Sequence, residues 1–136
     1  MEPSEAIQTF LDNIRQWREQ YSLAHENVGR EDKRLQDLLH GLEFSSDGEE
    51  FQAACEKLRE SRRVRRVNKD TVLLLEHIVQ FFGEEPNRKV LNQLTQLLGR
   101  QRKQEAFLRS ERTYKPRVEE PPGIMGEALK KAREEG

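Results

Sequence analysis

Apolar residues recur every seven positions through the first third of the chain. The repeat comprises Ile7, Ile14, Tyr21, Val28, Leu35 and Leu42, and Phe10, Trp17, Ala24 and Leu38 each follow a member of it by three residues. A seven-residue repeat of this length is typical of a helix that packs along one seam with slight left-handed supercoiling. The pattern predicts one helix over 4–43, with Ser4 as its N-cap. Gly29 lies inside this helix and weakens it by about 1 kcal/mol relative to alanine.

Two apolar stripes predict a second helix over 49–82. Residues 45–48 read Ser-Ser-Asp-Gly, a turn, and the acidic pair Glu49 and Glu50 suits the positive end of the helix that follows. The first stripe comprises Phe51, Ala54, Leu58, Val72, Leu75, Val79 and Phe82, and the second comprises Val64, Val67, Leu74, Ile78 and Phe81. Because two stripes need two neighbours, we expect this helix to be the middle member of a bundle. Gly83 is its expected C-terminal cap.

A third helix is predicted over 86–111, and Pro86 suits its first turn. Its apolar residues are Val90, Leu91, Leu94, Leu97, Leu98, Phe107 and Leu108. Short connections favour antiparallel neighbours, so residues 1–112 are expected to form an all-α, elongated, up-down-up three-helix bundle that resembles a coiled coil. Residues 113–136 contain three of the five prolines and are expected to be an extended tail with a short last helix over 126–135.

Polar residues interrupt the apolar seams of all three predicted helices at one height. When the antiparallel hairpins are aligned, the interrupting residues fall at the same level; they are Glu31, Ser61, Arg65, Asn68, Gln101 and Glu105. A buried arginine is costly unless it is paired or hydrated, and Glu26, Glu31 and Glu105 are the candidate partners of Arg65. We therefore expect a polar layer between two apolar lobes. Such a layer fixes the register of the helices, and the alternative is a small ligand-binding cavity between them.

A basic face accompanies this layer on the second helix. At about 100° of rotation per residue, five cationic residues fall within one third of the helix circumference; they are Arg59, Arg62, Arg63, Arg66 and Lys69. The planar guanidinium group suits phosphate oxygens, so this face is a candidate for contact with a nucleic-acid backbone. The chain as a whole has 24 basic and 25 acidic residues and provides no broad positive field. A salt-bridged, hydrated helix face is the alternative.

The composition limits the chemistry that the chain offers. With 34% apolar and 36% charged residues, the core must be thin, as in long helices with broad solvated faces. His25, His40 and His77 show no metal-ligand spacing, and the single cysteine, Cys55, excludes an intramolecular disulfide. We expect no catalytic residues, no metal and no cofactor. The acidic opening residues and the lack of a long apolar run predict a cytoplasmic protein without a membrane segment.

Two short elements of the sequence are distinctive. The first is residues 62–70, Arg-Arg-Val-Arg-Arg-Val-Asn-Lys-Asp, which is followed by Leu-Leu-Leu-Glu at 73–76. The second is Tyr-Lys-Pro-Arg at 114–117. In these elements the chain resembles small uncharacterised helical proteins of phages and prophages of Gram-positive bacteria. The resemblance carries no known activity. It implies that a set of six residues acts together, namely Arg66, Lys69, Asp70, Tyr114, Pro116 and Arg117.

Three functions are compatible with these features. The leading hypothesis is a non-enzymatic helical interaction or scaffolding protein that presents its faces to a protein partner or to a second copy of itself. The alternative is nucleic-acid binding through the basic face of the second helix. The third is binding of a small ligand at the polar layer.

Overall fold

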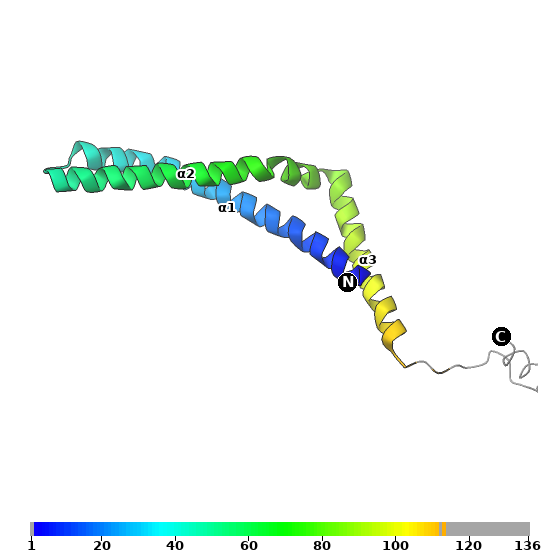
Figure 1. Ribbon diagram of the computed structural model, residues 1–136. Helices are drawn as coiled ribbons and strands as arrows, with labels where there is room; N and C mark the ends of the chain where they lie inside the picture. Colours follow the sequence, from blue (N-terminus) through cyan, green and yellow to red (C-terminus); the bar gives the residue numbers. More distant parts are fainter. Residues whose placement is uncertain (1, 112, 114–136) are drawn as a thin grey trace, which may run out of the picture. The chain divides into compact units, whose positions relative to one another are not determined.

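A computed structural model describes residues 2–111 and 113, and these form three α-helices. The helices are α1 (Pro3–Glu43), α2 (Gly48–Gly83) and α3 (Glu85–Arg109) (Figure 1). The prediction of an all-α three-helix bundle is confirmed, and no helix end lies more than two residues from the predicted one. The predicted short helix at 126–135 and the proline-rich tail beyond Thr113 lie outside the described residues.

The chain divides into two units, Met1–Glu105 and Ala106–Gly136. The first unit contains α1, α2 and α3 as far as Glu105. The described part of the second unit contains the last turn of α3, where the backbone N–H of Ser110 bonds to the carbonyls of Ala106 and Phe107. Phe107 and Leu108 are both about half exposed in this turn.

Helix α1 is continuous from Pro3 to Glu43, and Gly29 does not interrupt it. A Cβ built at Gly29 meets no atom within 4 Å, so the packing around this position does not require a glycine. The helix begins one residue earlier than predicted, with Pro3 in its first turn, where the missing N–H of proline costs nothing. Ser4 is therefore not the N-cap. The N-cap is Glu2, and its side chain makes no capping hydrogen bond.

Asp47, the last residue of the turn between α1 and α2, caps the N-terminus of α2. Asp47, in extended conformation, accepts the backbone N–H of Glu50 through Oδ1 at 2.8 Å. The Glu50 carboxylate in turn accepts the backbone N–H and the hydroxyl of Ser46, each at 2.7 Å. The bond from Asp47 satisfies a first-turn N–H that the helix would leave unpaired, and the two bonds from Ser46 lower the pKa of Glu50.

Helices α1 and α2 pack side by side as an antiparallel hairpin. The buried apolar residues of the described chain are few; they are Ile14, Ala24, Val72, Leu75 and Leu98. At the open end of the hairpin the rings of Phe10 and Phe82 meet edge to face, with centroids 6.1 Å apart. Arg18 donates to the carbonyl of Phe82 at 2.7 Å and so places a cation at the negative end of α2.

Helix α3 does not return along α2 as the up-down-up order predicted. The chain turns sharply at Glu84, which has extended backbone dihedrals, and α3 leaves the line of α2 (Figure 1). Gly83 has no positive φ, so it ends α2 without acting as a left-handed cap. Residues of α1 and α3 line a common groove, in which Leu91 of α3 lies near Arg18 of α1. Further along α3, Leu98 and Arg102 line the same groove, and Arg102 bonds to Gln8 of α1. α3 therefore runs antiparallel to the first half of α1.

Candidate functional site: the polar layer and the outer face of the second helix

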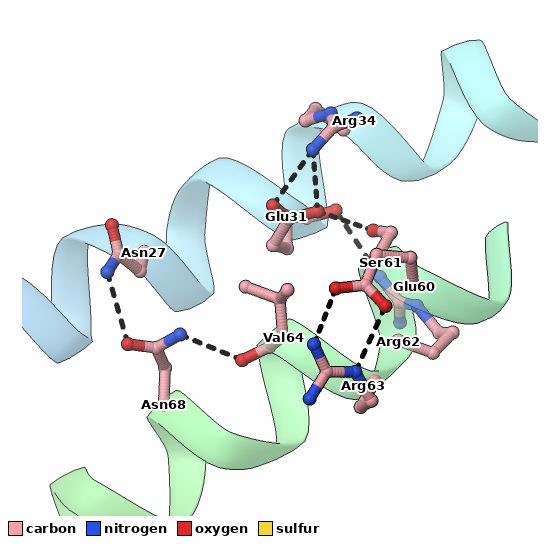
Figure 2. A network of polar contacts seen from close by, with 9 residues as sticks. All are labelled: Asn27, Glu31, Arg34, Glu60, Ser61, Arg62, Arg63, Val64 and Asn68. Carbon is pink, nitrogen blue, oxygen red and sulfur yellow. Dashed lines mark hydrogen bonds and ion pairs between the residues drawn. The ribbon is translucent and has the colours of Figure 1, made fainter. Parts of the chain in front are cut away.

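The centre of the hairpin contains a buried carboxylate that is fully paired. Glu31 of α1 is 5% exposed and Ser61 of α2 is 2% exposed. The Ser61 hydroxyl donates to Oε2 of Glu31, and Arg34 donates to both carboxylate oxygens, at 3.0 and 3.3 Å (Figure 2). Because a buried charge is tolerated only with partners, these contacts make Glu31 compatible with the core of the hairpin.

A pair of asparagine side chains, Asn27 of α1 and Asn68 of α2, extends the polar layer beyond Glu31 and Ser61. Asn27 donates through Nδ2 to Oδ1 of Asn68 at 3.1 Å, and Asn68 donates to the carbonyl of Val64 at 2.8 Å (Figure 2). An asparagine pair across a helical seam has its full hydrogen bonding only in one register. The pair therefore has the geometry of a register-setting contact between α1 and α2.

Two arginines of α2, Arg62 and Arg65, donate hydrogen bonds to α1 at the level of the layer. Arg65 donates through Nε to Asp32 at 2.6 Å, so its partner is neither Glu31, Glu26 nor Glu105, as had been expected. Arg62 donates through Nη2 to the backbone carbonyl of Glu31 at 3.3 Å. Its Nε is buried and has no hydrogen-bond partner within the described chain.

Two residues predicted for this layer lie elsewhere. Glu105 is buried against the start of α1, where it accepts the backbone N–H and the hydroxyl of Ser4, at 3.1 and 2.6 Å. Gln101 bonds to Glu105 and lies at the same end. The prediction failed for these two because α3 runs antiparallel to α1, which brings its last turns to the N-terminus of α1. Glu31, Arg65 and Asn68 do lie together.

The Glu105 carboxylate of α3 accepts a first-turn N–H of α1, whose N-cap residue makes no capping hydrogen bond with its side chain. The hydrogen bond from the Ser4 hydroxyl is the largest cause that holds the pKa of Glu105 below its ordinary value, and Gln101 and Arg102 add to it. A carboxylate at a helix N-terminus also interacts favourably with the helix dipole. Arg102 also donates to Oε1 of Gln8 on α1, one turn along.

Sequence reasoning missed the partners Asn27 and Arg34, and it placed Asp32 near the arginines without assigning it to Arg65. Arg34 follows Glu31 by three residues, a spacing at which side chains of one helix meet, and this signal was present in the sequence. Asn27 and Asp32 flank the seam of α1 instead of occupying it. A search confined to seam positions therefore does not find them.

The five residues of the basic face divide into two groups. Arg62 and Arg63 are engaged, the latter with Glu60 through Nη2 at 2.6 Å and Nε at 3.0 Å. Arg59, Arg66 and Lys69 are exposed and form no hydrogen bond or ion pair with any described residue. Three cations thus remain available to an anionic partner.

The outer face of α2 carries large apolar side chains that no other described element covers. Leu74 is 74% exposed, Leu73 57%, Phe81 53% and Val67 52%. Val67, Leu74 and Phe81 follow one another at intervals of seven residues, so they line one face of the helix. This is the second stripe for which a neighbouring helix was predicted. It is exposed because α3 turns away at Glu84.

A groove lies between α1 and α2, beside the polar layer on the side of the hairpin turn. Its volume is about 550 Å³, and small residues, Gly41, Ala53 and Ala54, line it together with Arg34 and Lys57. In the described chain, the buried polar atom that lacks a hydrogen-bond partner is Nε of Arg62, and Arg62 does not line this groove. The groove therefore adds no support to the hypothesis of a ligand at the layer.

Among the described residues, no three His, Cys, Asp or Glu side chains lie close enough together to hold a metal ion. None of the helices in the described part of the chain has an apolar stretch long enough to span a bilayer. No protein-family model, curated protein or solved structure matches this chain, so the resemblance to phage proteins remains a prediction.

Proposed function

We propose that this protein is a non-enzymatic helical interaction protein and that the outer face of α2 is its contact surface. The observation that carries the proposal is the exposed heptad stripe of Val67, Leu74 and Phe81. Apolar side chains at this spacing are the signature of helix-to-helix packing, and clustered exposed apolar residues mark interaction sites. The small core of the described chain adds support, because a thin hairpin gains stability from a partner that covers this face.

The polar layer has a supporting role in this proposal. The Glu31–Ser61 contact and the Asn27–Asn68 pair favour one register of α1 against α2. A fixed register determines which residues of α2 point away from α1. The layer thereby keeps Leu74 and its neighbours on the outer face. This explains why a polar interruption occurs in the seam without a catalytic role.

The experiment compares light scattering and binding of an apolar fluorescent dye for the wild type and for a Leu74→Gln, Phe81→Gln variant. We expect the wild type to associate or to bind the dye strongly, and the variant to do neither while it keeps its helical circular dichroism. A matched control is Leu23→Gln, which removes an exposed leucine of α1 that is 56% accessible. A strictly monomeric wild type whose dye binding is unchanged in the variant would contradict the proposal.

Nucleic-acid binding is the second candidate function, and it is favoured by three exposed cations that form no ion pair with a described residue, namely Arg59, Arg66 and Lys69. Contacts from these residues would be to phosphates, so binding would be sensitive to salt and weakly dependent on sequence. Gel-shift titration at low and moderate salt compares an Arg66→Gln, Lys69→Gln variant with an Arg30→Gln, Lys33→Gln control of the same spacing. Loss of binding in the first variant alone supports this function. Failure of the wild type to bind DNA or RNA at low salt rules it out.

A further inference from the structure

A seam at coiled-coil spacing runs along α2 beside the side that contacts α1. Its residues alternate in steps of three and four; they are Val64, Val67, Thr71, Leu74, Ile78 and Phe81. This spacing is that of the two core positions of a heptad repeat, and the seam spans about three heptads. Leu74, near its middle, is the most exposed apolar residue of the helix at 74%, whereas Val64, Thr71 and Ile78 are half-buried.

The seam is complementary to itself when it is reversed. In an antiparallel pair of helices, each core position of one kind faces a core position of the other kind on the partner. Applied to two copies of α2, this rule gives three kinds of contact, namely Val64 with Phe81, Val67 with Ile78, and Thr71 with Leu74. No seam position is left without a partner. Large Phe81 faces small Val64, which is the alternation of sizes that allows close packing.

Charges beside the seam are complementary in the same arrangement. The flanking positions on the solvent side of the seam, away from α1, are Arg63, Asp70, His77 and Glu84. In the antiparallel pair, Arg63 of one copy lies beside Glu84 of the other, and Asp70 lies beside His77. Both pairings bring opposite or hydrogen-bonding groups together, whereas a parallel pair would place these residues beside Asn68, Leu75 and Phe82 of the second copy and form neither pairing. Among the described residues Arg63 contacts the exposed Glu60, and Glu84 accepts a 3.3 Å hydrogen bond from Asn87; both contacts are exposed and leave room for this pairing.

We propose that a second copy of this chain docks along α2 in antiparallel orientation, with a two-fold axis that passes between Val72 and Leu73. This inference rests on the proposed function and names its partner. A two-fold interface uses the same patch on both copies, and a patch that is complementary to itself is what such an interface requires. Because the turn at Glu84 directs α3 away from α2, no described helix other than α1 lies against the seam, and Val67, Leu74 and Phe81 are exposed to the second copy.

Disulfide crosslinking tests the orientation. In a Cys55→Ser background, Val67→Cys and Ile78→Cys chains are oxidised separately and as a mixture. The antiparallel dimer predicts at least tenfold more crosslinked dimer in the mixture than in either chain alone. Efficient crosslinking of the Val67→Cys chain alone would overturn the proposal, because residues 67 of the two copies are adjacent only in a parallel pair. Absence of crosslinking in every sample would overturn it as well.

A charge exchange provides an independent readout by sedimentation equilibrium. Arg63→Glu places two acidic groups together at each end of the dimer, and we expect its dissociation constant to rise roughly tenfold. Adding Glu84→Arg restores the opposite charges and most of the affinity. If the double variant is no tighter than the single one, the antiparallel pairing is wrong.

The outcomes of these tests separate the two proposals. Loss of association in the Leu74→Gln, Phe81→Gln variant without the predicted crosslink leaves the contact surface in place and removes the antiparallel dimer. A wild type that neither associates nor loses dye binding in that variant contradicts both.

Discussion

Replacement of Ser61 by alanine tests the central contact of the polar layer. The substitution removes the hydroxyl that donates to the buried carboxylate of Glu31 and leaves Arg34 as its side-chain partner. A hydrogen bond to a charged group contributes about 1.5–3 kcal/mol, and serine to alanine inside a helix recovers about 0.5 kcal/mol. We expect a net loss of roughly 1–2.5 kcal/mol in the free energy of unfolding.

Urea denaturation followed by helical circular dichroism measures this loss. Ser22→Ala is the matched control, because Ser22 is an exposed serine inside α1 and its replacement is expected to be neutral or slightly stabilising. A change in Ser61→Ala within about 0.3 kcal/mol of the Ser22→Ala change would refute the energetic role of the contact. Such a result would mean that water or Arg34 satisfies Glu31 equally well.

A second substitution separates stability from register. Glu31→Leu combined with Ser61→Ala replaces the polar contact with an apolar one, which in other buried ion pairs is neutral or stabilising. We expect this double variant to be at least as stable as Ser61→Ala alone. If the layer sets the register, the double variant loses sharp amide dispersion in its NMR spectrum although it remains helical. Wild-type dispersion would show that the Asn27–Asn68 pair suffices.

Three further predictions concern the helices themselves. Gly29→Ala is expected to stabilise the chain by about 0.5–1 kcal/mol in urea denaturation, because its Cβ meets no atom within 4 Å; destabilisation would contradict this. Asp47→Ala removes the cap of α2 and is expected to cost about 1 kcal/mol, measured in the same way, and an unchanged midpoint would show that Glu50 alone suffices. The lowered pKa of Glu105 predicts stability that is present in full above pH 4.5 and is lost as the pH falls through the lowered value. The melting temperature of the wild type should therefore exceed that of Glu105→Gln at pH 7 and approach it in acid, and a constant difference would exclude the link to Ser4.

The helices were predictable because the apolar period and the turn residues are local signals. The cap at Asp47, the acidic start of α2 and the proline near the start of α3 lie within a few residues of the ends that they mark. The position of α3 was not predictable in this way. Its direction depends on the backbone of Glu84 and on contacts such as Glu105 with Ser4, which join residues far apart in the sequence.

The polar layer was predictable where it involves the hairpin and not where it involves α3. A short turn fixes the heights of α1 against α2, so Glu31 was correctly placed near Ser61. The alignment of α3 against α2 assumed a second antiparallel hairpin at Gly83, and this hairpin does not form. The individual partners depend on rotamers, and for that reason Asp32 rather than Glu31 bonds to Arg65.

The concentration dependence of the melting temperature tests the central claim most directly. A partner that binds only the folded chain raises its stability by mass action, so a chain that pairs through α2 must melt at higher temperature when it is more concentrated. We expect the wild type to show this rise over a hundredfold range of concentration and the Leu74→Gln, Phe81→Gln variant to show none. A wild-type melting temperature that is independent of concentration and equal to that of the variant would contradict association through this face.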